Sequence, residues 1–74
     1  MIIYDNINKD NWHEIKDILP VITEIRYLNL SWMELTEFPK MLHITINGYF
    51  GCSNNKITSF KNCPKIKGYQ LIEF

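Results

Sequence analysis

The chain has a single arginine, no alanine, and no apolar run long enough for a membrane span. Arg26 and seven lysines are balanced by eight acidic residues, which gives a formal net charge of zero. Such a chain has no broad positive field for phosphate backbones, which argues against sequence-independent nucleic-acid binding. Its longest apolar runs have four or five residues, whereas a spanning helix needs about 20. We therefore expect a soluble protein without a membrane segment.

Cysteine and histidine are also scarce. Cys52 and Cys63 lie eleven residues apart, a spacing that fits neither a metal site nor a redox pair. His13 and His43 are 30 residues apart, and neither has a nucleophile at a catalytic spacing. A dyad of Cys52 and His43 would require another strand register than the one favoured below. We predict no cofactor, no metal and no enzyme activity.

The N-terminus shows no signal-peptide pattern, because Met1–Tyr4 is followed at once by polar residues. Together with reduced thiols, this favours a cytoplasmic location. Twelve isoleucines, eight asparagines and seven lysines indicate a coding sequence rich in A and T. Many phages, giant viruses and some bacteria have such sequences, so a phage- or virus-encoded protein in the host cytoplasm is the expected origin.

Apolar residues recur 22 positions apart in the middle of the chain. The four pairs are Leu28/Phe50, Leu30/Cys52, Leu35/Ile57 and Phe38/Phe60. Recurrence at a fixed period of 20–50 residues is typical of repeat architectures.

A third copy is indicated downstream, where residues 66–69 echo residues 46–49 at an offset of 20. The literal match directs Gln70 inward, whereas a shift by one residue directs Tyr69 and Leu71 inward. Side-chain alternation along a strand favours the shift.

This spacing resembles the leucine-rich repeat, L-x-x-L-x-L-x-x-N/C-x-L. Two copies fit its pattern, one through Ile25, Leu28, Leu30 and Leu35, the other through Phe50, Cys52, Asn55 and Ile57. The segment C-S-N-N-K-I-T-S-F at 52–60 is similar to asparagine-rich variants found in viral and bacterial proteins. Two positions depart from the pattern, because Met33 replaces the asparagine of the first copy and Asn47 replaces the first aliphatic residue of the second.

The resemblance implies an α/β fold, a short solenoid with a small parallel sheet and one strand per copy. It covers residues 25–74, about two and a half copies, and residues 1–24 are expected to form an N-terminal cap. For Met1–Tyr4 a strand is favoured over a flexible tail. The family also implies binding through the solvent-facing residues of the strands, and not catalysis.

The cap is expected to contain a helix over Asp10–Leu19. Four apolar residues fall on one helical face, namely Trp12, Ile15, Ile18 and Leu19. Asp10 or Asn11 is expected to accept hydrogen bonds from the first free amides, and Pro20 to end the helix.

If the register is correct, six exposed residues form the predicted partner-binding set: Arg26, Tyr27, Asn29, Trp32, Tyr49 and Asn54. Large aromatic and arginine side chains with polar neighbours are typical of protein-binding hot spots. Two alternatives stay open. Tyr27 and Tyr49 could merely stack to stabilise the sheet, and Trp32 could pack under the helix.

These residues favour a small protein–protein interaction module that blocks or redirects a host protein through its concave sheet. The alternative is a structural subunit of a larger viral assembly that self-associates through its last strand, by Leu71, Ile72 and Phe74, because no cap is evident there. Four lysines gather in the C-terminal third, at 56, 61, 65 and 67. They suit an acidic partner, head-to-tail association or simply a solvated face.

Overall fold

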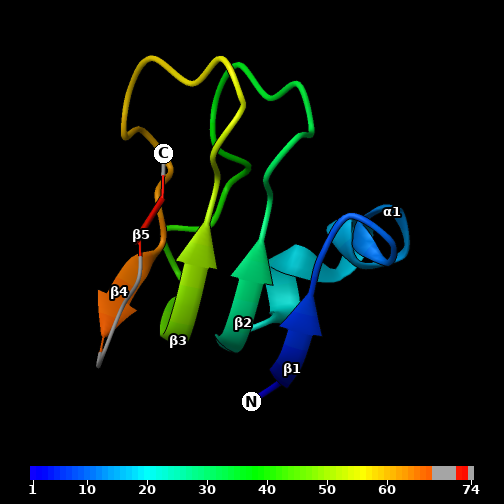
Figure 1. The fold of residues 1–74 in the computed structure, drawn as a ribbon. Coiled ribbons are helices and arrows are strands. Elements are labelled where there is room, and N and C mark those ends of the chain that lie inside the picture. The colour runs from blue at the N-terminus through cyan, green and yellow to red at the C-terminus, as the bar shows by residue number, and fades with distance from the viewer. Residues whose placement is uncertain (68–71, 74) are drawn as a thin grey trace.

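The protein is a small mixed α/β protein with a parallel sheet and one short α-helix, as Figure 1 shows. The computed structural model describes residues 1–67 and 72–73. Strands lie in the order β1 (Ile3–Ile7), β2 (Glu24–Asn29), β3 (Thr45–Gly51) and β4 (Lys65–Lys67). A two-residue strand, β5 (Ile72–Glu73), also pairs with β3, alongside its end. All of these pairings are parallel, which confirms the predicted parallel sheet.

The register of β2 and β3 changes along the strands. Ile25 pairs with Ile46 at an offset of 21, and Leu28 pairs with Phe50 at the predicted offset of 22. Between these pairs, Arg26 faces both Asn47 and Gly48, so that β3 carries one extra residue in a β-bulge. The bulge explains the irregular Asn47. It moves this residue to the exposed side and lets Ile46 occupy the inward position beside Ile25.

On the other side of β3, the pairing is split between two strands. β4 follows β3 at an offset of 20, with Ile66 opposite Ile46. β5 follows at an offset of 22, with Ile72 opposite Phe50. The residues that distinguish the two predicted registers, Tyr69, Gln70 and Leu71, lie outside the described residues.

The core lies between the sheet and the long connections that follow β2 and β3. The strands contribute alternate apolar side chains, and the connection between β2 and β3 contributes Phe38, Met41 and Ile44. Phe38 sits between Phe50 and Phe60, with ring centroids at 6.0 and 6.4 Å. Phe38 and Phe50 are buried, and burial of such a side chain contributes roughly 1.5–3 kcal/mol.

The helical segment differs from its prediction in position and in form. It is not N-terminal, because β1 precedes it and joins the sheet beside β2. Only Trp12–Ile15 is α-helical (α1), and Lys16–Val21 continues as a 3-10 helix (η1). Pro20 lies inside η1 and does not end it. A 3-10 helix tolerates this proline because such helices are short and rely less on regular hydrogen bonds than a long α-helix does.

The predicted cap of this helix is also wrong. Asn11 occupies the N-cap position without a side-chain bond to the helix. Its Oδ1 instead accepts the backbone N–H of Asn8 at 2.8 Å, which closes the turn after β1. The predicted apolar face is confirmed, because Ile15 and Leu19 are buried and Trp12 and Ile18 pack against the core.

One asparagine connects the turns that follow β2 and β3. The Oδ1 of Asn55 accepts the backbone N–H groups of Met33 and Leu35, both at 3.0 Å. Its Nδ2 donates to the carbonyls of Leu30 and Cys52, at 2.7 and 3.0 Å. The turn that contains Met33 therefore takes its polar partner from the neighbouring turn.

Candidate functional site

Two tyrosines stand side by side on the exposed face of the sheet. Tyr27 and Tyr49 are paired residues on β2 and β3, and their rings stack with centroids 4.8 Å apart and planes inclined by 18°. Tyr27 is 37 % exposed. The ring of Tyr49 lies over Gly51, where a Cβ atom would collide with it. The predicted juxtaposition is confirmed, and the absence of a side chain at Gly51 is what gives the ring its place.

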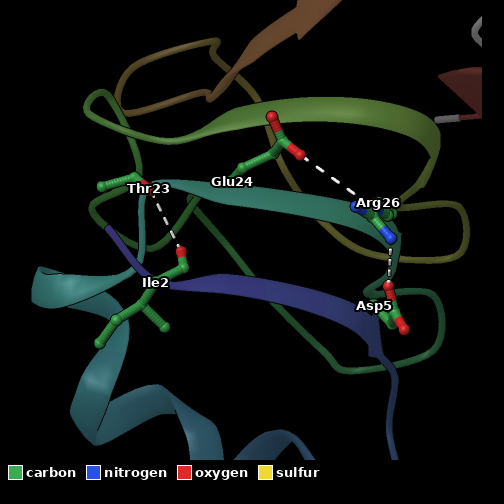
Figure 2. A network of polar contacts seen from close by, with 5 residues as sticks. All are labelled: Ile2, Asp5, Thr23, Glu24 and Arg26. Atoms are coloured by element: carbon green, nitrogen blue, oxygen red, sulfur yellow. Dashed lines mark hydrogen bonds and ion pairs between the residues drawn. The ribbon is translucent and has the colours of Figure 1, made fainter.

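Arg26, another predicted binding residue, takes part in a polar network within the protein (Figure 2). Its Nη1 donates to Oδ1 of Asp5 on β1 at 3.0 Å, and its Nε lies 4.0 Å from Oε2 of Glu24. Just before β1 and β2 begin, Oγ1 of Thr23 donates to the carbonyl of Ile2 at 3.1 Å. Because the arginine and Asp5 side chains are 59 % and 81 % exposed, these pairs add little stability. They place the guanidinium near Asp5 of β1 and Glu24 of β2.

The strand ends carry short polar side chains. Oδ1 of Asn29 accepts the backbone N–H of Ser31 at 3.0 Å, which shapes the turn after β2. The hydroxyl groups of Ser31 and Ser53 lie 3.1 Å apart, and the N–H of Trp32 donates to the carbonyl of Ser53. These bonds hold the turns after β2 and β3 side by side, in the same 22-residue register as the strands.

Trp32 has an unusual backbone for its size. Its φ angle is 62°, in the left-handed region, and the equivalent residue of the next turn, Asn54, has a φ angle of 58°. Asparagine tolerates this region, whereas a bulky residue there is an outlier. The side chain of Trp32 is 67 % exposed. The alternative that Trp32 packs under the helix is therefore wrong.

A hollow of about 280 Å³ opens beside Trp32 at the C-terminal end of β1 and β2. It is lined by Asn8, Lys9, Asp10, Asn29, Ser31 and Trp32. The sequence pattern predicted Asn29 and Trp32 as binding residues but did not indicate the turn that follows β1. That turn could have been found from the rule that ligands bind at the carboxyl ends of parallel strands, because these ends meet at one edge of the sheet.

The predicted self-association residues belong to the end of the chain. Ile72 lies in β5 opposite Phe50. Leu71 and Phe74 lie outside the described residues, so self-association through this strand stays a prediction.

Neither thiol has the lowered pKa that is typical of a reactive cysteine. Cys52 is buried in its predicted inward position, and this burial, with a smaller contribution from Cys63, raises the pKa of its thiol to about 11. Burial also raises the pKa of Cys63. Nε2 of His43 lies 2.8 Å from the carbonyl oxygen of Leu19. Within residues 1–67 and 72–73, no cluster of side chains could hold a metal ion.

The protein is thus a small parallel-sheet protein whose exposed sheet face carries tyrosine, asparagine and serine side chains. No helix in the described part of the chain has the length and apolar character of a membrane span. Comparison with protein-family models, with curated proteins and with solved structures found no match.

Proposed function

We propose that this protein is a short solenoid of the leucine-rich-repeat type that binds another protein through the exposed face of its sheet. Two features of the described residues support the repeat assignment. Equivalent residues of β2 and β3 pair at an offset of 22 from Tyr27 onward. Asn55, in the asparagine position of the repeat pattern, makes the turn-closing bonds that this position requires.

The observation that carries the binding role is the composition of the exposed face around the tyrosine stack. Tyr27 and Tyr49 are surrounded by asparagine, serine and glycine, with Arg26 and Trp32 at its margins. This is the composition of antibody paratopes, in which rigid tyrosines supply contact area and small polar side chains supply adaptable hydrogen bonds. Stacking does not compete with binding, because it fixes both rings before the partner arrives and lowers the entropy lost on association.

The partner we propose is a host protein, and the module is phage- or virus-encoded and acts by occupying or redirecting that partner. Its role is binding and not catalysis. The contact set is the predicted one, with the tyrosine pair at its centre and Asn29 and Asn54 toward the strand ends.

The test starts from capture of partners by the immobilised protein from a lysate of its native host cell. Each captured protein is then purified, and its affinity is measured by calorimetry for the wild type and for Tyr27→Ser. We expect a loss of roughly 2 kcal/mol or more, because a hot-spot aromatic is removed and its stacked neighbour is released. Matching far-UV circular dichroism of the two proteins would establish that the variant is folded.

Leu42→Ser is the matched control. Leu42 is 62 % exposed and lies just before β3 begins, at the opposite end of the strands from Trp32. It should leave the affinity unchanged. Equal affinity of Tyr27→Ser and wild type for every captured protein would contradict the proposed face.

A further inference from the structure

The turn after β2 sets the left-handed backbone of Trp32, but tryptophan is an unusual residue for that conformation. Its left-handed backbone is one that asparagine adopts at the equivalent position of the next turn. Its indole, 67 % exposed, also gains little from burial. A bulky side chain that is both strained and exposed points to a role in binding, because strained backbone is retained mainly at functional sites.

The hollow beside the indole offers polar groups of both kinds. Lys9 and Asp10 bring opposite charges, so that the lining has no net charge. Oδ1 of Asn29 is occupied by the N–H of Ser31, which leaves its Nδ2 as a donor. Among the described residues, neither the ammonium group of Lys9 nor the indole N–H of Trp32 has a hydrogen-bond partner. The hollow thus combines the flat apolar ring of Trp32 with several hydrogen-bond donors and one carboxylate acceptor.

We propose that this hollow binds a pyranose ring of a neutral glycan. A pyranose ring has an apolar face of C–H groups, which fits the flat face of Trp32. Its hydroxyl groups both donate and accept, which fits Asp10 on one side and Lys9 and Asn29 on the other. An acidic ligand would meet the carboxylate of Asp10, and a purely apolar one would leave the polar lining unpaired. The hollow shares Asn29 and Trp32 with the proposed protein-binding set, but its other lining residues lie outside that set, whose centre is the tyrosine stack.

Titration of the full chain with cellobiose, maltose and di-N-acetylchitobiose tests the proposal. The two indole N–H signals are followed by nuclear magnetic resonance, and Trp12, which packs against the core, is the internal reference. We expect a saturable shift of the Trp32 signal alone with at least one disaccharide at concentrations up to about 50 mM, the range that detects a millimolar Kd. Lys9→Ala should weaken binding several-fold.

Trp32→Asn is the decisive variant, read by the chemical shifts of the backbone amides around the hollow. Asparagine suits the left-handed turn, so this variant should fold, melt at a higher temperature than wild type, and bind the same disaccharide at least roughly tenfold more weakly. Leu42→Asn, a change of the same kind at an ordinary exposed site, should alter neither property. Tyr27→Ser should leave the titration unchanged, which separates this proposal from the protein-binding face.

Three results would overturn the proposal. The first is the absence of a saturable Trp32 shift with all three disaccharides. The second is unchanged disaccharide binding by Trp32→Asn. The third is a response to the acidic peptide acetyl-Gly-Glu-Gly-amide but to none of the sugars, which would assign the hollow to recognition of a protein carboxylate.

Discussion

The turns that follow β2 and β3 have similar apolar residues at equivalent positions, but these residues are buried to very different extents. Phe38 is 1 % exposed, whereas Phe60, 22 residues later, is 68 % exposed. Met41 is fully buried, and its counterpart Cys63 is only partly buried. The difference follows from position, because the first turn lies between two neighbours and the second covers it. The burial of these residues is therefore set by whether an adjacent turn covers them.

The side-chain hydrogen bonds are also unequally divided between the two turns. The second turn contains Asn55 and the first contains Met33 at the same position, yet Asn55 serves both turns. The second turn thus supplies to the first both an aromatic cover and hydrogen bonds. The second turn receives less from the first in return. We therefore expect the same substitution at equivalent positions of the two turns to lower the free energy of unfolding by different amounts.

The largest inequality is expected for the phenylalanine pair. Phe38→Ala removes a fully buried ring from between Phe50 and Phe60 and should lower the free energy of unfolding by about 3–5 kcal/mol. Phe60→Ala removes a mostly exposed ring and should cost about 1 kcal/mol or less. Urea unfolding followed by circular dichroism measures both.

Because a domain of this size has little stability to lose, Phe38→Leu supplies a milder variant that should stay folded. Its loss should still exceed that of Phe60→Leu. Equal losses in the two positions would show that the second turn is covered as well as the first, and the positional argument would then be wrong.

The next largest effect is expected for Asn55→Ala. The change leaves the N–H groups of Met33 and Leu35 and the carbonyl of Leu30 without their partner. Unpaired groups in a partly buried turn should lower the free energy of unfolding by about 2–4 kcal/mol. Asn47→Ala, on the exposed side of β3, is the matched control and should change it by less than about 0.5 kcal/mol.

Hydrogen exchange locates the effect of this substitution. Loss of protection in Asn55→Ala should include Met33 and Leu35, in the other turn. Loss confined to residues 52–57 would contradict the view that one asparagine holds two turns.

Part of the fold could be predicted because the apolar period is strong. The offset of 22 is enough to pair Leu28 with Phe50 and to place Tyr27 beside Tyr49, and both pairings are confirmed. The helix was misjudged for two reasons. A short 3-10 segment leaves no periodicity of its own, and Pro20 is acceptable there. The strand favoured over a flexible tail at the start of the chain is confirmed, because β1 (Ile3–Ile7) pairs with β2 in the same sheet.

The candidate site was predicted on β2, on β3 and in the turns that follow them, but not in the turn after β1. Asn8, Lys9 and Asp10 lie in the turn after β1, whose offset of 21 from β2 falls outside the period of 22. The left-handed backbone of Trp32 could have been inferred, because its counterpart is Asn54. Its exposure could not, because that depends on how the neighbouring turns pack.

The bulge in β3 allows a last and smaller comparison, between two glycines three residues apart. Gly48 has a φ angle of 151°, and a Cβ atom there would collide with the backbone carbonyl of Arg26. A Cβ atom on Gly51 would meet only the ring of Tyr49, which can rotate away. Gly48→Ala should therefore lower the free energy of unfolding by about 2 kcal/mol, whereas Gly51→Ala should lower it by less than about 1 kcal/mol.

The two variants should also differ in kind. Gly51→Ala should displace Tyr49 from its stack on Tyr27 and change the near-ultraviolet circular dichroism, while the sheet keeps its register. Gly48→Ala should instead disturb the amide signals of β2 on either side of Arg26, because the extra residue can no longer be accommodated without moving that backbone. If Gly48→Ala were as stable as wild type, the bulge would not depend on the positive φ angle of Gly48.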